Sequence, residues 1–175
     1  MPNFLEIAEL GEPVLRAPTG PVAAPADDSL RAFAADLMAT MERSQGVGIA
    51  APQVYRSDRI FIVATRPNPR YPDAPTMEPT IVLNPEIIER SDEIVAGWEG
   101  CLSIPGIRGL VPRPRRIVAR YQTLDGEVVE REFVDFPARV FQHEDDHLRG
   151  IVFLDRLASN RDIITEKEYR KMVAG

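Results

Sequence analysis

The spacing of apolar residues predicts a helix near the start of the chain. Apolar side chains recur at intervals of three or four residues between Leu30 and Met41, which places them on one face of an amphipathic helix over residues 29–44. Asp27 offers an N-cap before this segment, and Gly46 supplies a stop after it. We therefore expect a helix that packs one face against a core.

Short apolar runs in the middle of the chain predict strands. The first three runs are Arg59–Thr65, Ile81–Asn84 and Ile94–Trp98. Between them, Pro67–Pro79 contains five prolines, so a loop is expected there. Two later runs, Arg115–Tyr121 and Val128–Val134, flank the turn signal Leu124-Asp125-Gly126. This arrangement predicts a β-hairpin.

Helical spacing returns after these strands. It begins at Pro137 and stops near Gly150, and a last helix is expected near Asp162–Val173. Strands in the middle with helices on both sides predict an α+β fold, in which small mixed or antiparallel sheets pack around the helix that begins at Pro137. No linker, repeat or low-complexity stretch divides residues 1–175, so we expect a single domain.

Composition and net charge limit the classes of function that the chain can have. The chain of 175 residues is 44% apolar and 27% charged, which is typical of globular proteins. Its net charge of −6 argues against a dedicated nucleic-acid binder, so no nucleic-acid specificity is expected. The basic pair Arg115 and Arg116 is followed by Glu127, Glu130 and Glu132. This pattern favours a charge-laced strand pair over a phosphate-binding patch.

The sequence also indicates in which compartment the protein is expected. The longest apolar run, Ile60–Ala64, is far shorter than the roughly 18 residues that a membrane helix needs. The beginning of the sequence lacks the pattern of a secretory signal, and a single Cys forbids an internal disulfide. We expect a cytoplasmic protein, of bacteria or of a cytosol-like compartment, with no membrane partner. An organellar protein that has already been trimmed fits the same pattern.

The second helix carries a metal-binding pattern. His143 and His147 are four residues apart, so their imidazoles lie on the same face of a helix and can converge on one ion. Glu144 follows the first His, where a carboxylate can accept a proton from water beside the ion. Chance would produce this spacing together with a Glu directly after the first His on the order of one time in a thousand for a chain with two His. A polar helix face is the weaker interpretation.

A catalytic site usually has a third protein ligand. Phe153 stands where one group of metalloproteases has a third His, so that option is closed. Glu166 or Glu168 could complete a second type of site, although both lie in a charged helix start. Cys101 is the third candidate, and its alternatives are a buried hydrophobe or the nucleophile of a Cys–His pair.

A glycine-bearing segment, GVGIAAPQ at 46–53, is the last candidate for chemistry. Its glycines permit close approach of backbone or substrate, and the amide of Gln53 can donate to a developing oxyanion. By itself the signal is weak, because a glycine-bearing loop that enters a strand has many uses. No Lys-Ser or Lys-Thr follows it, so a phosphate-binding loop is excluded.

Three segments together resemble the signature motifs of the peptide deformylase family. They are GVGIAAPQ at 46–53, EGCLS at 99–103 and QHEDDHL at 142–148. They occur in the family's order and at its usual separations, and the resemblance extends through 11–16 and 108–113. The three motifs jointly are highly specific, whereas the helix motif alone is not.

The resemblance implies a single catalytic domain that removes the formyl group from the N-terminal formyl-methionine of new polypeptides. It implies Cys101, His143 and His147 as ligands of one divalent metal, with iron(II) expected and zinc, nickel or cobalt as alternatives. It also implies Glu144 as general base and acid, with Gln53 and the backbone N–H of Leu102 facing the oxyanion.

The resemblance also implies a substrate site and partners. The residues expected to bind substrate are Gly46, Val47, Gly48, Glu99, Gly100, Phe136, Arg139 and Val140. Val47 and Gly48 would pair with the peptide backbone, and Arg113 could pair with Glu99 to steady the loop around Cys101. The expected partners are N-formyl-methionyl nascent chains. Transient proximity to the ribosome and a monomeric state are further expectations.

Two positions depart from the family pattern, and two other functions stay open. Asp145 occupies a position that is usually apolar, and Asp135 stands where a Gly is common. The second hypothesis is a metalloprotease with Glu166 or Glu168 as third ligand. The third is a binder of metal or N-terminal peptides without catalysis, against which the presence of Glu144 and Gln53 argues.

Overall fold

The computed structural model describes residues 2–174, which form two antiparallel sheets around a central helix. The helices are α1 (Asp28–Arg43), α2 (Asp135–His147) and α3 (Glu166–Ala174). The strands are β1 (Gly48–Ala50), β2 (Ile60–Val63), β3 (Thr80–Arg90), β4 (Ile94–Cys101), β5 (Ile104–Pro114), β6 (Arg116–Gln122), β7 (Val128–Val134) and β8 (Ile163–Thr165). One sheet has the order β1-β2-β3-β6-β7 and the other β4-β5-β8. The predicted α+β class is confirmed.

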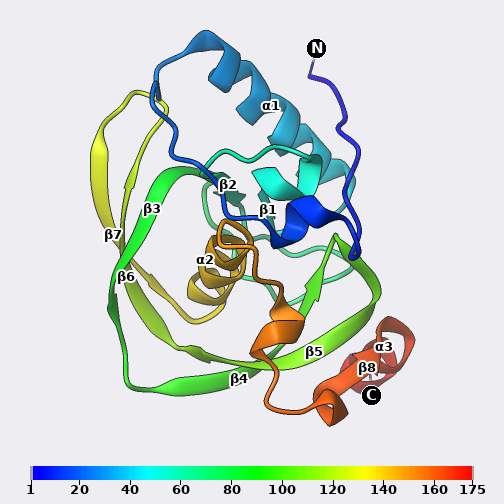
Figure 1. The fold of residues 1–175 in the computed structure, drawn as a ribbon. Helices are drawn as coiled ribbons and strands as arrows, with labels where there is room; N and C mark the ends of the chain where they lie inside the picture. Colours follow the sequence, from blue (N-terminus) through cyan, green and yellow to red (C-terminus); the bar gives the residue numbers. More distant parts are fainter. Residues whose placement is uncertain (1, 175) are drawn as a thin grey trace.

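The helix α2 lies between the two sheets, and α1 covers the opposite face of the larger sheet (Figure 1). Strand β2 shows how the sequence produces this layering. Ile60 and Ile62 pack with α1, whereas Phe61 and Val63 pack with α2. Because successive strand residues face opposite sides, a strand that is buried on both faces must be apolar throughout. The middle of α2 is buried on every side, from Ala138 to His147.

Several predicted boundaries are wrong. The run Ile81–Asn84 is only the beginning of β3, which continues to Arg90 after an irregularity at Asn84 (φ +49°). The predicted strand end at Trp98 is also wrong, because β4 continues to Cys101. The helix expected from Asp162 begins only at Glu166, since the preceding three residues pair with β5 as β8.

Strand β5 was not predicted at all. It contains Pro105, Pro112 and Pro114, together with two glycines, and these residues are typical of turns. In the structure β5 nevertheless pairs with β4 from Ile94↔Pro114 to Glu99↔Gly109. The long partner strand outweighs the local preference, so the pairing is a tertiary effect.

One edge of the larger sheet is formed by β1. Strand β1 pairs with β2 on one side and is the first strand of its sheet.

Among residues 2–174, no helix has the length and apolar character needed to cross a membrane.

Candidate active site

Helix α2 and the end of β4 bring together three side chains that can ligate a metal. Cys101, His143 and His147 are buried, and their ligand atoms all lie within 4.8 Å of one another. Cys101 Sγ lies 3.3 Å from His147 Nε2, and the two imidazole rings have centroids 5.1 Å apart. The one-turn spacing on α2 aligns the two His, and β4 supplies the sulfur from across the core.

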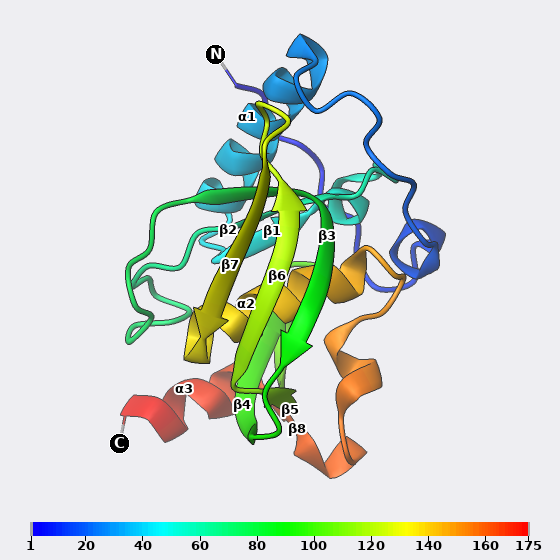
Figure 2. The same ribbon diagram turned by 90° about the vertical axis from the view of Figure 1, so that its left-hand side faces the viewer.

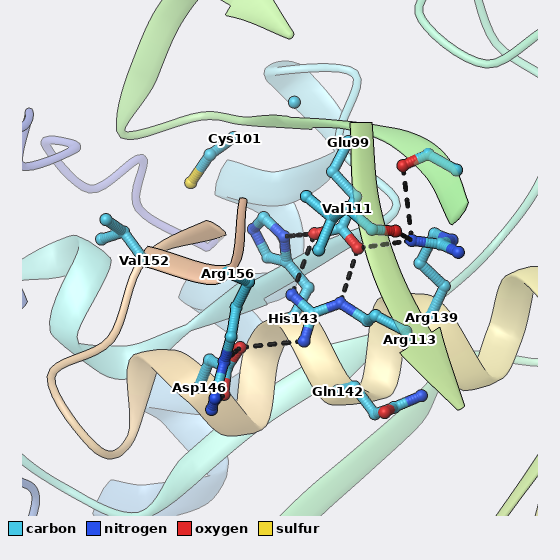
Figure 3. A network of polar contacts seen from close by, with 12 residues as sticks. Glu99, Cys101, Val111, Arg113, Arg139, Gln142, His143, Asp146, Val152 and Arg156 are labelled. Carbon is cyan, nitrogen blue, oxygen red and sulfur yellow. Dashed lines mark hydrogen bonds and ion pairs between the residues drawn. The ribbon is translucent and has the colours of Figure 1, made fainter. Parts of the chain in front are cut away.

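A buried carboxylate holds one of these imidazoles in place. Glu99 Oε2 lies 2.9 Å from His143 Nδ1, and Arg113 binds the same carboxylate at 2.6 and 3.0 Å (Figure 3). Arg139 adds a contact of 2.9 Å to Oε1. These contacts fix the His143 ring with Nδ1 toward Glu99, which leaves Nε2 for the cluster. The predicted pair between Glu99 and Arg113 is confirmed.

The network continues away from the cluster to the protein surface. Arg113 Nη1 donates to Asp146 at 2.9 Å, and Arg156 donates to the same carboxylate at 2.6 and 3.1 Å (Figure 3). No role was predicted for Asp146 or Arg156. The position of Asp146 inside the motif on α2 is a signal that could have pointed to it, but nothing in the sequence indicates that Arg156 would reach α2.

The buried titratable groups of the site differ in the direction of their pKa shifts, and two of them have a lowered pKa. Burial disfavours the thiolate, but the imidazoles of His147 and His143 outweigh burial and hold the pKa of Cys101 well below its usual value. Burial likewise opposes ionisation of Glu99, yet Arg113 and His143 keep its pKa well below the ordinary range.

Glu144 behaves in the opposite way. Burial raises its pKa to about 7, and the nearby imidazoles offset only part of this effect. Its Oε2 atom is buried without a hydrogen-bond partner. A carboxyl group that titrates near neutral pH can both accept and return a proton.

Gln53 faces the cluster from the short 3₁₀ helix Ala51–Val54. Its Oε1 accepts from the backbone N–H of Ala50 at 2.9 Å. This contact directs Nε2 toward Cys101 Sγ at 3.4 Å and Ser103 Oγ at 3.2 Å. A fixed amide donor therefore lies beside the cluster.

One pocket brings the expected site residues together. Its lining contains Gly46, Val47, Gly48, Gln53, Glu99, Gly100, Cys101, Leu102, Phe136, Arg139, Val140, His143 and Glu144. The remaining expected residue, His147, lies in the three-residue cluster. Three lining residues were missed, namely Arg70, Tyr71 and Trp98. The first two belong to the proline-rich loop between β2 and β3, whose path the sequence does not define.

The glycine at position 48 is required by close packing. A Cβ placed on Gly48 would lie 2.5 Å from Glu144 Oε1 and 2.8 Å from a methyl carbon of Val140. Strand β1 therefore passes directly over the carboxylate. A peptide that pairs with the edge of β1 would be held next to Glu144.

The alternative third ligands lie elsewhere. Glu166 binds Arg108 at 2.6 and 3.0 Å, and Glu168 binds Lys171 at 2.7 Å on the surface of α3. Within residues 2–174, the candidate metal cluster contains only Cys101 and the two His of α2. The structure therefore gives no support to the metalloprotease hypothesis.

The three residues fit a divalent transition metal by their donor chemistry. A thiolate and two imidazoles are borderline-soft ligands that suit zinc, iron, nickel and cobalt, and the lowered pKa of Cys101 favours the thiolate form that a metal needs. With a buried carboxylate and an amide donor beside it, this is the type of site found in metal-dependent hydrolases.

Comparisons with known proteins give the family. The family model for polypeptide deformylase matches residues 4–162. A peptide deformylase 2 of Nostoc sp. is 52% identical over 172 residues, which covers 98% of this chain and 96% of the relative. The Met-Ala-Ser-bound structure of class I type b peptide deformylase from Acinetobacter baumannii has a TM-score of 0.87 at 50% identity, covering 90% of this chain and 100% of that one. A peptide deformylase structure from Thermotoga maritima has a TM-score of 0.80 at 39% identity, with coverages of 90% and 99%.

The chain therefore belongs to the polypeptide deformylase family. Members of this family are hydrolases that remove the N-formyl group from nascent peptides, and this protein is such a hydrolase.

Proposed function

We propose that Cys101, His143 and His147 hold one divalent metal and that this site hydrolyses the formyl amide of N-formyl-methionyl peptides. The observation that carries the proposal is the convergence of three buried ligand atoms within 4.8 Å beside Glu144, whose carboxyl group has an unpartnered buried oxygen. A bound divalent ion supplies Lewis acidity at the reacting carbonyl and makes water more acidic. Iron(II) is the proposed metal, with zinc, nickel or cobalt as alternatives of the same donor preference.

Glu144 moves the proton. Its carboxylate accepts a proton from the water that attacks the formyl carbon and returns it to the leaving nitrogen of methionine. A pKa near 7 suits both steps, since the group is easily protonated and deprotonated at neutral pH. The products are formate and a peptide with a free amino group.

Gln53 and the backbone N–H of Leu102 stabilise the negative charge that develops on the formyl oxygen. Both residues line the same pocket as Glu144. The Gln53 amide is fixed in advance by its contact with Ala50, so it needs no reorganisation during the reaction. Removal of one such donor typically lowers the rate about 10² to 10³-fold.

The substrate peptide lies along the edge of β1. Gly46, Val47 and Gly48 line the pocket, and β1 is the first strand in the order of its sheet. Pairing through main-chain hydrogen bonds holds many different sequences equally well. The methionine side chain lies against Phe136 and Val140, and Glu99 and Gly100 form the wall next to Cys101.

We also propose that residues 1–175 act as one catalytic domain, as a monomer, in the cytoplasm and in transient proximity to the ribosome. The support is the family membership, because formylated N-termini arise on ribosomes. The net charge of −6 gives no support to a nucleic-acid interface. Sedimentation of the purified protein with and without ribosomes tests the monomeric state and the ribosome contact.

The test of the proposed function combines formate release with metal analysis. Anaerobically purified protein should release formate from formyl-Met-Ala-Ser and contain about one metal per chain. Glu144→Gln should retain the metal and lose about 10² to 10⁴-fold in kcat, whereas Cys101→Ala should lose the metal. Metal retention in Cys101→Ala, or no formate from the wild type, contradicts the proposal.

A further inference from the structure

The N-terminal segment, which we define as residues 3–19, has no role in the proposed function, although the resemblance to the family extends through residues 11–16. Apart from the 3₁₀ helix Pro13–Arg16 it is irregular. Figure 1 shows the segment in dark blue, running from α1 toward the turn between β4 and β5. Figure 2 shows its 3₁₀ helix beside the C-terminal end of α2. The segment therefore lies next to several parts of the chain that carry the site.

Two backbone N–H groups of this segment bind the two loops that hold the proposed oxyanion donors. The N–H of Ala8 donates to the carbonyl oxygen of Gln53 at 2.8 Å. The N–H of Leu10 donates to the carbonyl oxygen of Ser103, also at 2.8 Å, and Ser103 directly follows Leu102. These bonds connect two loops that are 50 residues apart in the sequence.

Ser103 closes the connection on the side of the active site. Gln53 donates through Nε2 to Ser103 Oγ at 3.2 Å, and both side chains are buried. This contact and the two backbone bonds form a closed ring of hydrogen bonds. The amide oxygen of Gln53 is already fixed by a backbone N–H. Because one Nε2 hydrogen is bound to Ser103, the other hydrogen is left to point toward the cluster, where Cys101 Sγ lies at 3.4 Å.

Both ends of the segment are anchored to helices. The N–H of Leu5 donates to Thr40 Oγ1 of α1 at 2.9 Å. Thr19 donates through its N–H and its hydroxyl to the carbonyl oxygen of Leu148, at 3.0 and 2.8 Å, directly after the last residue of α2. Because its ends are fixed to α1 and α2, the middle of the segment can hold the two loops at a set separation.

We propose that the N-terminal segment is a positioning element for the two donors that stabilise the formyl oxygen. The proposal rests on the proposed function, in which the Gln53 amide and the Leu102 N–H face that oxygen. The ring fixes both donors, because Ser103 binds the Gln53 amide and its carbonyl group, one residue after Leu102, is held by the segment. Donors that are placed in advance need no reorganisation, and a displacement of about 1 Å can lower a rate about 10²-fold. The segment should therefore affect kcat more than KM.

Two proline variants test the bond from Leu10. Residues 9–12 form a turn in which the N–H of Glu12 donates to the carbonyl oxygen of Glu9 at 3.0 Å, with a φ of +120° at Gly11. Proline is common as the second residue of a turn whose third residue has a positive φ. Leu10→Pro therefore removes the N–H donor and keeps the local backbone. It should lower kcat for formyl-Met-Ala-Ser about tenfold, with little change in KM.

Glu9→Pro is the matched control for this variant. The N–H of Glu9 donates to no acceptor within residues 2–174, so its removal should leave kcat unchanged.

A double-mutant cycle tests whether the effect passes through the amide of Gln53. Ser103→Ala removes the hydroxyl that orients this amide and should lower kcat about tenfold, whereas Gln53→Ala should lower it about 10² to 10³-fold. The double variant should lose no more than Gln53→Ala alone, because the hydroxyl then has no amide to orient. Metal content should stay at the wild-type level in all three variants.

Hydrogen exchange in the metal-stripped protein gives a readout that does not depend on activity. Loss of the bond from Leu10 should speed the exchange of backbone amides in residues 101–104 about tenfold, because the turn between β4 and β5 opens more often. Glu9→Pro should exchange these amides at the wild-type rate.

The outcomes separate the positioning role from the proposed function. Formate release with equal kcat in Leu10→Pro and Glu9→Pro overturns the positioning role and leaves the proposed function intact. Equal exchange rates in the two proline variants do the same, as does a loss from Ser103→Ala that persists in full in the Gln53→Ala background. Absence of formate from the wild type overturns the proposed function, and the positioning role with it.

Discussion

Two buried glutamates beside the cluster of Cys101, His143 and His147 have opposite surroundings. Glu99 receives hydrogen bonds from Arg113, Arg139 and His143, and its pKa is held well below the ordinary range. Glu144 has an oxygen with no partner, and burial raises its pKa to about 7. The same type of side chain is thus held as an anion at position 99 and titrates near neutral pH at position 144, and the difference comes from the neighbouring donors.

The largest loss of stability should come from removing Glu99, the carboxylate whose two oxygens both accept hydrogen bonds. Glu99→Ala leaves the buried guanidinium groups of Arg113 and Arg139 without their shared partner, so the free energy of unfolding should fall by about 3 to 5 kcal/mol. Urea unfolding at neutral pH measures this change. Glu132→Ala is the control, because Glu132 pairs with Arg116 on the exposed face of β6 and β7. Equal losses in both variants would contradict the distinction.

Replacing Glu144, the carboxylate with an unpartnered oxygen, should stabilise the folded protein instead of destabilising it. In metal-stripped protein, Glu144→Gln removes a buried charge that has an unpartnered oxygen, so the variant should be more stable than the wild type by about 2 to 3 kcal/mol. Thermal unfolding near pH 8, after treatment with a chelator, measures the difference. Glu42→Gln on exposed α1 should show almost none. A destabilised Glu144→Gln would mean that Glu144 has a structural role.

Replacing Glu99 by its amide tests positioning without removing volume. Glu99→Gln weakens the contact to His143 Nδ1, and loss of such a partner typically lowers metal affinity about 10 to 100-fold. Competition with a chromogenic chelator measures the affinity. Glu89→Gln, on the exposed part of β3, is the matched control. Unchanged affinity in Glu99→Gln would show that the ring of His143 is held by packing alone.

The surroundings of Glu166 are intermediate between those of Glu99 and Glu144, and its replacement should change the stability of the protein least. It pairs with the buried Arg108, and this hydrogen-bonded contact lowers its pKa. A lowered pKa in the folded state means that the stabilisation is present above the ordinary pKa and is lost as the pH falls below it. Glu166→Gln should therefore cost about 1 kcal/mol near pH 7 and less near pH 3.5. Urea unfolding at both pH values checks this, and a cost that grows in acid would contradict it.

Local sequence patterns were sufficient to predict the helices and strands whose hydrophobic periodicity is strong. The predicted helix 29–44 corresponds to α1 (Asp28–Arg43), and the hairpin of β6 and β7 lies where its turn signal placed it. The positive φ of +55° at Asp135 explains why Gly is common at that position. In this chain the carboxylate of Asp135 pairs with Arg115 at 2.7 Å.

Long-range pairing could not be predicted from the same patterns. The prolines of β5 indicate turns, and only the presence of β4 makes this segment a strand. Asp145 is buried in a helix, where the sequence offers no explanation, and it pairs with Arg149 at 2.8 Å one turn later. The proline-rich loop carries Tyr71 into the active site, although nothing in its composition indicates the path.

The sequence by itself determined which atoms were available for chemistry. It contains one thiol and two imidazoles, and the four-residue spacing on a helix places His143 and His147 together, because helix geometry is local. Tertiary structure decided that Cys101 rather than Glu166 joins them, since β4 ends at the cluster and Glu166 binds Arg108. It also decided the different charges of Glu99 and Glu144, because desolvation and hydrogen bonding depend on neighbours that are distant in the chain.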